Sequence, residues 1–226
     1  MIKLVVFDLD GTLINTISDL GEACNYALGL RGISGHSDEE YGTMVGHGIK
    51  QLIINALQKS LGISDAPDPE LVDSCLKDFT EYYVAHIDVH TRPYDGMPQL
   101  LAELQANGCL LAVASNKFQQ GTELLVKEFF PDIDFVALMG NSPELPLKPD
   151  AGVVRYIFEK AGIGQQECLM VGDSPTDMQT AKNAGIEAIA VSWGYRPEEV
   201  LKPLAARIAH SPQELSQFFR ELEIIA

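Results

Sequence analysis

Short apolar runs and longer segments of helical periodicity alternate along the chain. Five runs are short and apolar enough to be buried parallel strands: 3–7, 109–114, 134–139, 168–171 and 187–191. Apolar residues recur at helical spacing over 97–108, 118–130, 150–162, 176–185 and 211–222. Alternation of this kind is typical of a parallel sheet with helices on both faces. We therefore predict an α/β protein with a Rossmann-like, doubly wound parallel sheet.

One interval breaks this alternation. Residues 16–90, between the first two predicted strands, contain no convincing strand and instead show helical patterning over 17–30, 48–62 and 69–87. The segment HTRPYDG (90–96) contains a proline and a glycine, which mark the return to the sheet. We predict a core domain formed by 1–15 and 91–226, and an inserted helical cap domain formed by 16–90.

Composition and charge exclude several classes of function. The 226 residues include 16 basic and 32 acidic side chains, and a net charge of −16 would repel nucleic acid. No stretch approaches the roughly 20 apolar residues of a membrane span, and the first apolar run is too short for a signal peptide. The four cysteines form no CxxC pair. We expect a cytoplasmic protein, monomeric or homodimeric, without nucleic-acid or membrane partners.

Polar side chains occur close to the carboxyl ends of the predicted strands, where open parallel sheets bind their ligands. They follow the first, second and fourth predicted strands and precede the helix at 150. These side chains are Asp8, Asp10, Thr12, Ser115, Asn116, Lys117, Lys148, Asp173 and Asp177. The sequence thus gathers carboxylates, hydroxyls and lysines at one edge of the sheet.

The first two aspartates have a spacing that suits phosphoryl chemistry. Side chains two residues apart in an extended segment point the same way, roughly 6–7 Å apart. Asp8 can then attack phosphorus, while Asp10 gives a proton to the leaving oxygen and later takes one from water. Several carboxylates in one pocket require a cation, and oxygen ligands without histidine or cysteine favour Mg²⁺.

Each of these features also has a structural interpretation. An Asp-x-Asp pair at a strand end is often a turn or a helix cap, and Asp173 and Asp177 can cap the helix at 176. Lys148 alone can be a surface lysine. Four such segments at one edge of the sheet favour chemistry over these alternatives.

Four motifs occur in order around the helical insert: DLDGT (8–12), SN (115–116), KP (148–149) and GDSPTD (172–177). Together they resemble the motifs of the haloacid dehalogenase-like hydrolase superfamily, and the resemblance covers nearly the whole chain. Further segments resemble its phosphoglycolate phosphatase group, namely SDL (18–20), VGHGIKQLI (45–53), SNK (115–117) and LKPD (147–150). Asn15 departs from that group, which usually has an aspartate there.

The resemblance implies a role for each acidic residue of the motifs. Asp8 would be the nucleophile and a metal ligand, and Asp10 the general acid and base, with its main-chain carbonyl on the metal. Asp173 would be a metal ligand and Asp177 an acidic partner at the metal. The implied cofactor is Mg²⁺.

The remaining motif residues are expected to bind the substrate. Ser115 and Lys148 would hold the phosphate, the hydroxyl donating to a phosphoryl oxygen and the lysine supplying positive charge. We also expect Thr12 and Asn116 to contact the substrate. In the predicted cap, a glycine-containing loop and a nearby lysine would contact the part of the substrate beyond its phosphate. These residues are Gly46, His47, Gly48 and Lys50.

These expectations describe a Mg²⁺-dependent phosphatase that hydrolyses a small phosphorylated metabolite, such as phosphoglycolate, through an aspartyl-phosphate. A phosphosugar isomerase of the phosphoglucomutase type and a pyrophosphatase remain alternatives on the same scaffold. A non-catalytic binding module is disfavoured because Asp8, Asp10 and Asp173 are all present. A dehalogenase is disfavoured because that branch lacks the second aspartate.

Overall fold

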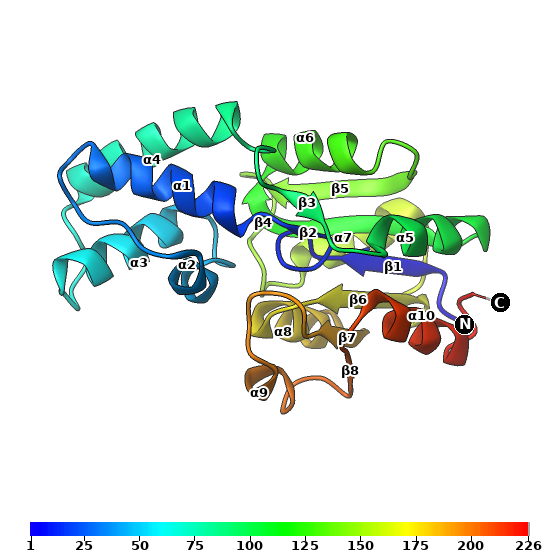
Figure 1. The fold of residues 1–226 in the computed structure, drawn as a ribbon. Helices are drawn as coiled ribbons and strands as arrows, with labels where there is room; N and C mark the ends of the chain where they lie inside the picture. The colour runs from blue at the N-terminus through cyan, green and yellow to red at the C-terminus, as the bar shows by residue number, and fades with distance from the viewer. Residues whose placement is uncertain (226) are drawn as a thin grey trace. The chain divides into compact units, whose positions relative to one another are not determined.

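The structure is a computed structural model that describes residues 1–225 (Figure 1). The chain forms two compact units. The sheet unit contains Met1–Asn15 and the chain from Pro93 onward, and the helical unit contains Thr16–Arg92. Where the chain passes between the units, two short strands, β2 (Ile14–Asn15) and β3 (Arg92–Pro93), pair with each other.

A six-stranded sheet forms the centre of the sheet unit, with strand order β5-β4-β1-β6-β7-β8 and parallel pairing throughout. The strands are β1 (Leu4–Phe7), β4 (Leu110–Phe118), β5 (Phe135–Asn141), β6 (Cys168–Gly172), β7 (Glu187–Val191) and β8 (Arg207–Ala209). The chain leaves β1 for β4 on one side and later returns to β6 on the other, so the strand order reverses at β1. The predicted α/β fold class is confirmed.

Helices cover both faces of this sheet. Leu4 and Val6 of β1 belong to a core cluster with residues of α7 and α8, while Val5 and Phe7 point to the opposite face and are equally buried. The helical segments are α5 (Met97–Ala106), α6 (Gln119–Phe129), α7 (Gly152–Ala161), η1 (Gln165–Glu167), α8 (Pro175–Ala184), α9 (Glu198–Leu201) and α10 (Pro212–Glu221). Burial on both faces explains why β1 is a continuous apolar run.

The structure corrects the expected end of the second strand. We expected it to end at 114, with Ser115, Asn116 and Lys117 in the following loop. Instead β4 runs on to Phe118, because its pairing with β5 resumes at Phe118 and Asn141 after an irregularity. The polar residues therefore lie within the strand, in the stretch where its pairing with β5 is irregular.

The helical unit contains α1 (Ile17–Gly29), α2 (Asp38–Met44), α3 (Ile49–Leu61) and α4 (Pro69–Ala85). Buried Asp19 in α1 accepts hydrogen bonds from the main-chain N–H groups of His90 and Thr91 and from the Thr91 hydroxyl. One carboxylate thus joins the first helix of this unit to its last residues. Within residues 1–225, every helix is too short or too polar to cross a membrane.

Candidate active site

Asp8 comes directly after β1, at the place where the strand order reverses. Its main-chain N–H donates to the carbonyl of Val171 on β6, which holds this residue against the sheet. Oδ1 of its carboxylate accepts from the Leu9 N–H at 2.7 Å and lies 2.9 Å from Nζ of Lys148. The strand end therefore presents a carboxylate that is oriented through one of its two oxygens.

Lys148 joins two carboxylates. Its Nζ lies 2.9 Å from Oδ1 of Asp8 and 2.6 Å from Oδ1 of Asp177, and its side chain is buried. The side-chain amide of Asn116 holds its main chain: Asn116 Oδ1 accepts from the Lys148 N–H at 2.8 Å, and Nδ2 donates to the Lys148 carbonyl at 3.0 Å. The Asn116 amide, expected to contact substrate, thus positions Lys148.

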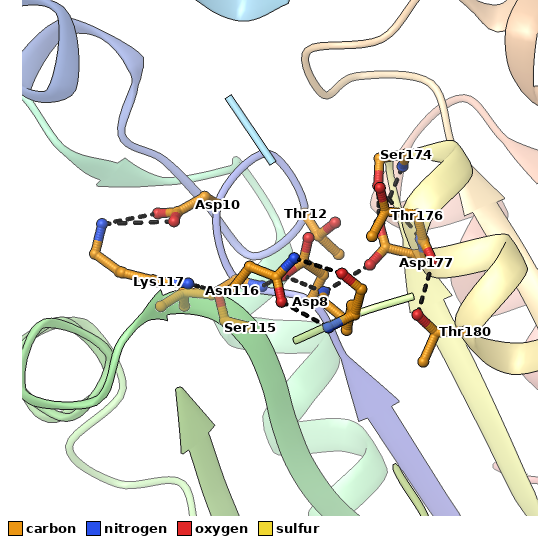
Figure 2. Close-up of polar contacts among 12 residues, drawn as sticks. Asp8, Asp10, Thr12, Ser115, Asn116, Lys117, Ser174, Thr176, Asp177 and Thr180 are labelled. Atoms are coloured by element: carbon orange, nitrogen blue, oxygen red, sulfur yellow. Dashed lines mark hydrogen bonds and ion pairs between the residues drawn. The ribbon is translucent and has the colours of Figure 1, made fainter. Parts of the chain in front are cut away.

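A third carboxylate, that of Asp173, lies close to the two that contact Lys148. Asp8, Asp173 and Asp177 each offer an oxygen within 4.8 Å of the other two. Asp177 also completes the N-terminal cap of α8, because its Oδ2 accepts from the N–H and the hydroxyl of Ser174 (Figure 2). Asp177 therefore both caps α8 and belongs to the acidic cluster.

The charges in this cluster are not balanced. Burial, and then the neighbouring Asp177, raise the pKa of Asp8 well above its usual value, and the same two causes raise the pKa of Asp173 to about 7. Burial lowers the pKa of Lys148, but the Asp177 and Asp8 carboxylates outweigh it, and the net shift is upward. Three buried carboxylates around one ammonium favour an additional cation, and an all-oxygen donor set suits a hard divalent ion. A divalent metal therefore fits this cluster.

Asp10 lies apart from the three clustered carboxylates. Its two carboxylate oxygens are 3.2 and 3.5 Å from Nζ of Lys117, whose side chain is buried, and Figure 2 shows the two side chains facing each other. Asp10 comes three residues after the last residue of β1 and forms an isolated bridge with Ile14, so the alternation of β1 does not continue to it. The two aspartates of the first motif are thus each held by a different lysine.

The two predicted hydroxyl ligands lie buried between the motifs. Thr12 Oγ1 donates to Oδ1 of Asp173 at 3.4 Å, and Ser115 Oγ accepts from the Lys117 N–H at 3.2 Å. Both hydroxyls therefore contact other residues of the site.

The four residues predicted in the cap loop belong to the helical unit. Gly46, His47 and Gly48 precede α3, and Gly48 is the N-cap with φ +83°. Lys50 is exposed, with its Nζ 3.4 Å from Asp73. The structure thus separates the predicted residues into eight in the sheet unit and these four in the helical unit.

A loop after β7, residues 192–196, contributes contacts that we did not predict. Its Tyr195 N–H donates to Oδ2 of Asp173 at 2.8 Å, and its Trp193 indole donates to the Thr12 carbonyl at 3.1 Å. A Cβ on Gly194 would lie 2.3 Å from Cβ of Asp173, so only glycine leaves room for that carboxylate. The signal available in the sequence was the position of this loop, directly after the fifth predicted strand.

Comparison with known families agrees with this geometry. A family model described as haloacid dehalogenase-like hydrolase matches residues 5–191. The chain is 34% identical over 200 residues to the phosphoglycolate phosphatase of Mesorhizobium japonicum, covering 87% of this chain and 86% of the relative. It is 35% identical over 196 residues to that of Thiobacillus denitrificans, covering 86% and 85%.

Solved structures show the same architecture. One is a protein from Lactobacillus delbrueckii subsp. bulgaricus for which phosphoglycolate phosphatase activity has been proposed; it superposes with a TM-score of 0.89 at 30% identity, covering 99% of this chain and 98% of that one. Another is CbbY from Rhodobacter sphaeroides in complex with phosphate, with a TM-score of 0.78 at 25% identity and coverage of 95% and 96%. The chain therefore belongs to the haloacid dehalogenase-like hydrolase family and is a phosphatase of its phosphoglycolate phosphatase-like group.

Proposed function

We propose that this phosphatase hydrolyses a small phosphate monoester by way of a phosphoryl group carried on Asp8. The observation that supports this proposal is the placement of the Asp8 carboxylate at the strand-order reversal, with Oδ1 held by Lys148 and the Leu9 N–H. Both contacts use Oδ1, so Oδ2 is the oxygen that we assign to attack on phosphorus.

In the first step, Asp8 Oδ2 forms a bond to phosphorus while the bond between phosphorus and the ester oxygen breaks. The electron pair of that bond goes to the leaving oxygen, which takes a proton from the carboxyl group of Asp10. Lys148, 2.9 Å from Asp8, offsets the negative charge that gathers as the anionic phosphoryl group approaches a carboxylate. The products of this step are an alcohol and an acyl phosphate on Asp8.

In the second step, a water molecule attacks the same phosphorus. Asp10, now ionised, takes a proton from that water, and the bond between phosphorus and Asp8 Oδ2 breaks. Inorganic phosphate leaves, Asp8 is again a carboxylate, and Asp10 is again protonated. Asp10 therefore acts as acid and then as base within one turnover.

We further propose that the cluster binds Mg²⁺ through carboxylate oxygens of Asp8, Asp173 and Asp177, with the Asp10 carbonyl as an additional ligand. The donor set contains oxygen alone, and burial followed by the neighbouring Asp177 raises the pKa of Asp8 and of Asp173, so a bound cation would stabilise their ionised forms. When bound, the ion neutralises charge on the phosphoryl oxygens. Ser115 and Thr12 remain proposed phosphate contacts.

We propose that the helical unit, Thr16–Arg92, is a cap domain that selects the leaving group. The loop at Gly46–Gly48 and Lys50 are its proposed substrate contacts. A domain with this role favours small substrates over phosphoproteins and nucleic acids, in agreement with the net charge of −16. The relatives named phosphoglycolate phosphatase make 2-phosphoglycolate the first substrate to test.

The test is a comparison of kcat/KM for 2-phosphoglycolate, pyrophosphate, nucleoside monophosphates and hexose phosphates, with and without Mg²⁺. We expect phosphate release, highest for 2-phosphoglycolate, and loss of activity on chelation. Another ester preferred by more than about tenfold, roughly 1.4 kcal/mol, would displace phosphoglycolate as the substrate. Conversion of glucose 1-phosphate to glucose 6-phosphate without phosphate release would contradict the hydrolase and support the isomerase.

A further inference from the structure

Lys117 is a buried lysine to which the steps above assign no role. Its side chain is 1% exposed, and its Nζ lies 3.2 Å from one oxygen of Asp10 and 3.5 Å from the other. A buried ammonium group is costly unless a carboxylate or several hydrogen bonds compensate it. The burial of the Lys117 ammonium group therefore requires an explanation. The Asp10 carboxylate is in direct contact with this group.

Lys117 lies near the end of β4, where the pairing with β5 is irregular. The residue lies on β4, next to β1, and the register that pairs Phe7 with Val113 brings the residues beyond Phe7 toward the end of β4. Its N–H donates to Ser115 Oγ at 3.2 Å. Asp10 lies beyond β1, in an isolated bridge with Ile14, and has a partly exposed side chain. The lysine is thus the more buried partner of the pair.

We propose that Lys117 is a positioning residue that sets the carboxyl group of Asp10 for proton transfer to the leaving oxygen. This inference rests on the proposed function, in which Asp10 is the general acid. A partly exposed aspartate side chain has several rotamers open to it, and proton transfer requires hydrogen-bond distance to one particular oxygen. A lysine that contacts both carboxylate oxygens restricts those rotamers. Lys148 orients the nucleophile, and Lys117 orients the acid.

The test compares two esters that differ in their need for a proton. p-Nitrophenyl phosphate has a leaving group that departs readily as an anion, whereas the alcohol of benzyl phosphate needs a proton. Both carry one ring and no second anionic group. The quantity to measure is kcat/KM, which covers the steps up to departure of the first product. A residue that serves the general acid affects benzyl phosphate far more than p-nitrophenyl phosphate.

For Lys117→Met we expect a loss of at least about tenfold on benzyl phosphate and less than about threefold on p-nitrophenyl phosphate. Asp10→Asn should show the same selectivity more strongly, and Lys117→Arg should recover part of the loss. In the Asp10→Asn background, Lys117→Met should have little further effect, because the two residues act through one proton transfer. Lys202→Met, which removes an exposed lysine paired with Glu198, is the matched control for loss of a positive charge.

Equal losses of kcat/KM for Lys117→Met on benzyl phosphate and p-nitrophenyl phosphate would show a purely structural role and overturn the proposal. A loss on 2-phosphoglycolate alone, as a raised KM, would show that Lys117 binds the substrate carboxylate instead. If Asp10→Asn lacks leaving-group selectivity, Asp10 is not the general acid and the inference falls with it. If the wild-type protein releases phosphate from none of these esters, the proposed function itself fails, and this outcome is distinguishable from the others.

Discussion

At the scale of single residues, Lys148 is the cation on which the acidic cluster depends. It contacts Asp8 and Asp177 at once and is buried with them. We predict that Lys148→Ala lowers kcat/KM by roughly 10²-fold or more, because charge stabilisation in the transition state is lost. It should also lower the free energy of unfolding by about 3–5 kcal/mol, the usual cost of leaving a buried charge without its partner.

The measurements for Lys148→Ala are steady-state kinetics and chemical denaturation. Lys202→Ala removes a lysine whose side chain is 59% exposed and should change neither quantity appreciably. Recovery of full activity in Lys148→Ala by a change of ionic strength alone would show that Lys148 acts through general surface charge, contrary to this account.

The sequence predicted which side chains of the site lie together where those side chains follow the ends of strands. Asp8 and Asp173 meet because the carboxyl ends of parallel strands share one edge of the sheet, and Asp177 follows in the first turn of α8. Lys148 lies instead in the connection between β5 and α7 and reaches Asp8 and Asp177 from there. The partner of Asn116 was not predictable, since its amide binds main-chain atoms 32 positions away along the chain. Such a contact depends on the path of the connection before α7, for which the sequence has no periodic signal.

At the scale of secondary-structure elements, Asn116 ties the end of β4 to the connection between β5 and α7. We predict that Asn116→Ala lowers kcat/KM by about tenfold or more, because Lys148 loses the support of its main chain. Two buried hydrogen bonds are lost, so the free energy of unfolding should fall by about 1–3 kcal/mol. Both effects are measurable by kinetics and by urea denaturation.

Asn183→Ala is the matched control for this variant. The Asn183 amide donates to the Pro149 carbonyl at 2.8 Å, next to Lys148 but on an exposed side chain. It should retain nearly wild-type kinetics. Equal activity of the Asn116→Ala and Asn183→Ala variants would mean that the amide pair at Lys148 does not position the lysine.

Long periodic elements were predicted closely and short ones were missed. The five predicted strands are present, the second of them extended to Phe118, and the helix predicted at 211–222 appears as α10, because each carries several apolar residues. β8 has three residues and owes its place to pairing with β7, through Arg207 and Ile189. α2 has seven residues and begins at a capping box on Ser37, too short a segment to show periodicity. Elements of this size depend on tertiary contacts.

At the scale of the whole molecule, the acidic cluster links stability to pH. The pKa of Asp173 is raised from 3.8 to about 7 in the folded, metal-free protein, mainly by burial and then by Asp177. Its folded state therefore binds the proton more tightly than the unfolded state, and stability falls as pH rises through this window. We predict that, in EDTA, the melting temperature of the wild-type protein falls as the pH rises from about 4 to about 7. The fall should be larger than that of the Asp173→Asn variant over the same range.

The same melting temperatures can be measured with Mg²⁺ in place of EDTA. Mg²⁺ competes with protons for the same carboxylates, so it should raise the melting temperature more at about pH 7.5 than at about pH 5. Asp173→Asn should weaken this response. A melting temperature that does not respond to Mg²⁺ at either pH would contradict the proposed metal site, independently of any activity assay.

The central claim is that Asp8 carries the phosphoryl group, and intact-protein mass spectrometry after rapid acid quench tests it most directly. During turnover of 2-phosphoglycolate or p-nitrophenyl phosphate with Mg²⁺, a fraction of the wild-type protein should gain the mass of one phosphoryl group, located in the peptide that contains Asp8. Asp8→Asn should show neither this species nor phosphate release, with an unchanged melting temperature. Phosphate release by Asp8→Asn within about tenfold of wild type, or a phosphoryl group on another residue, would contradict the account.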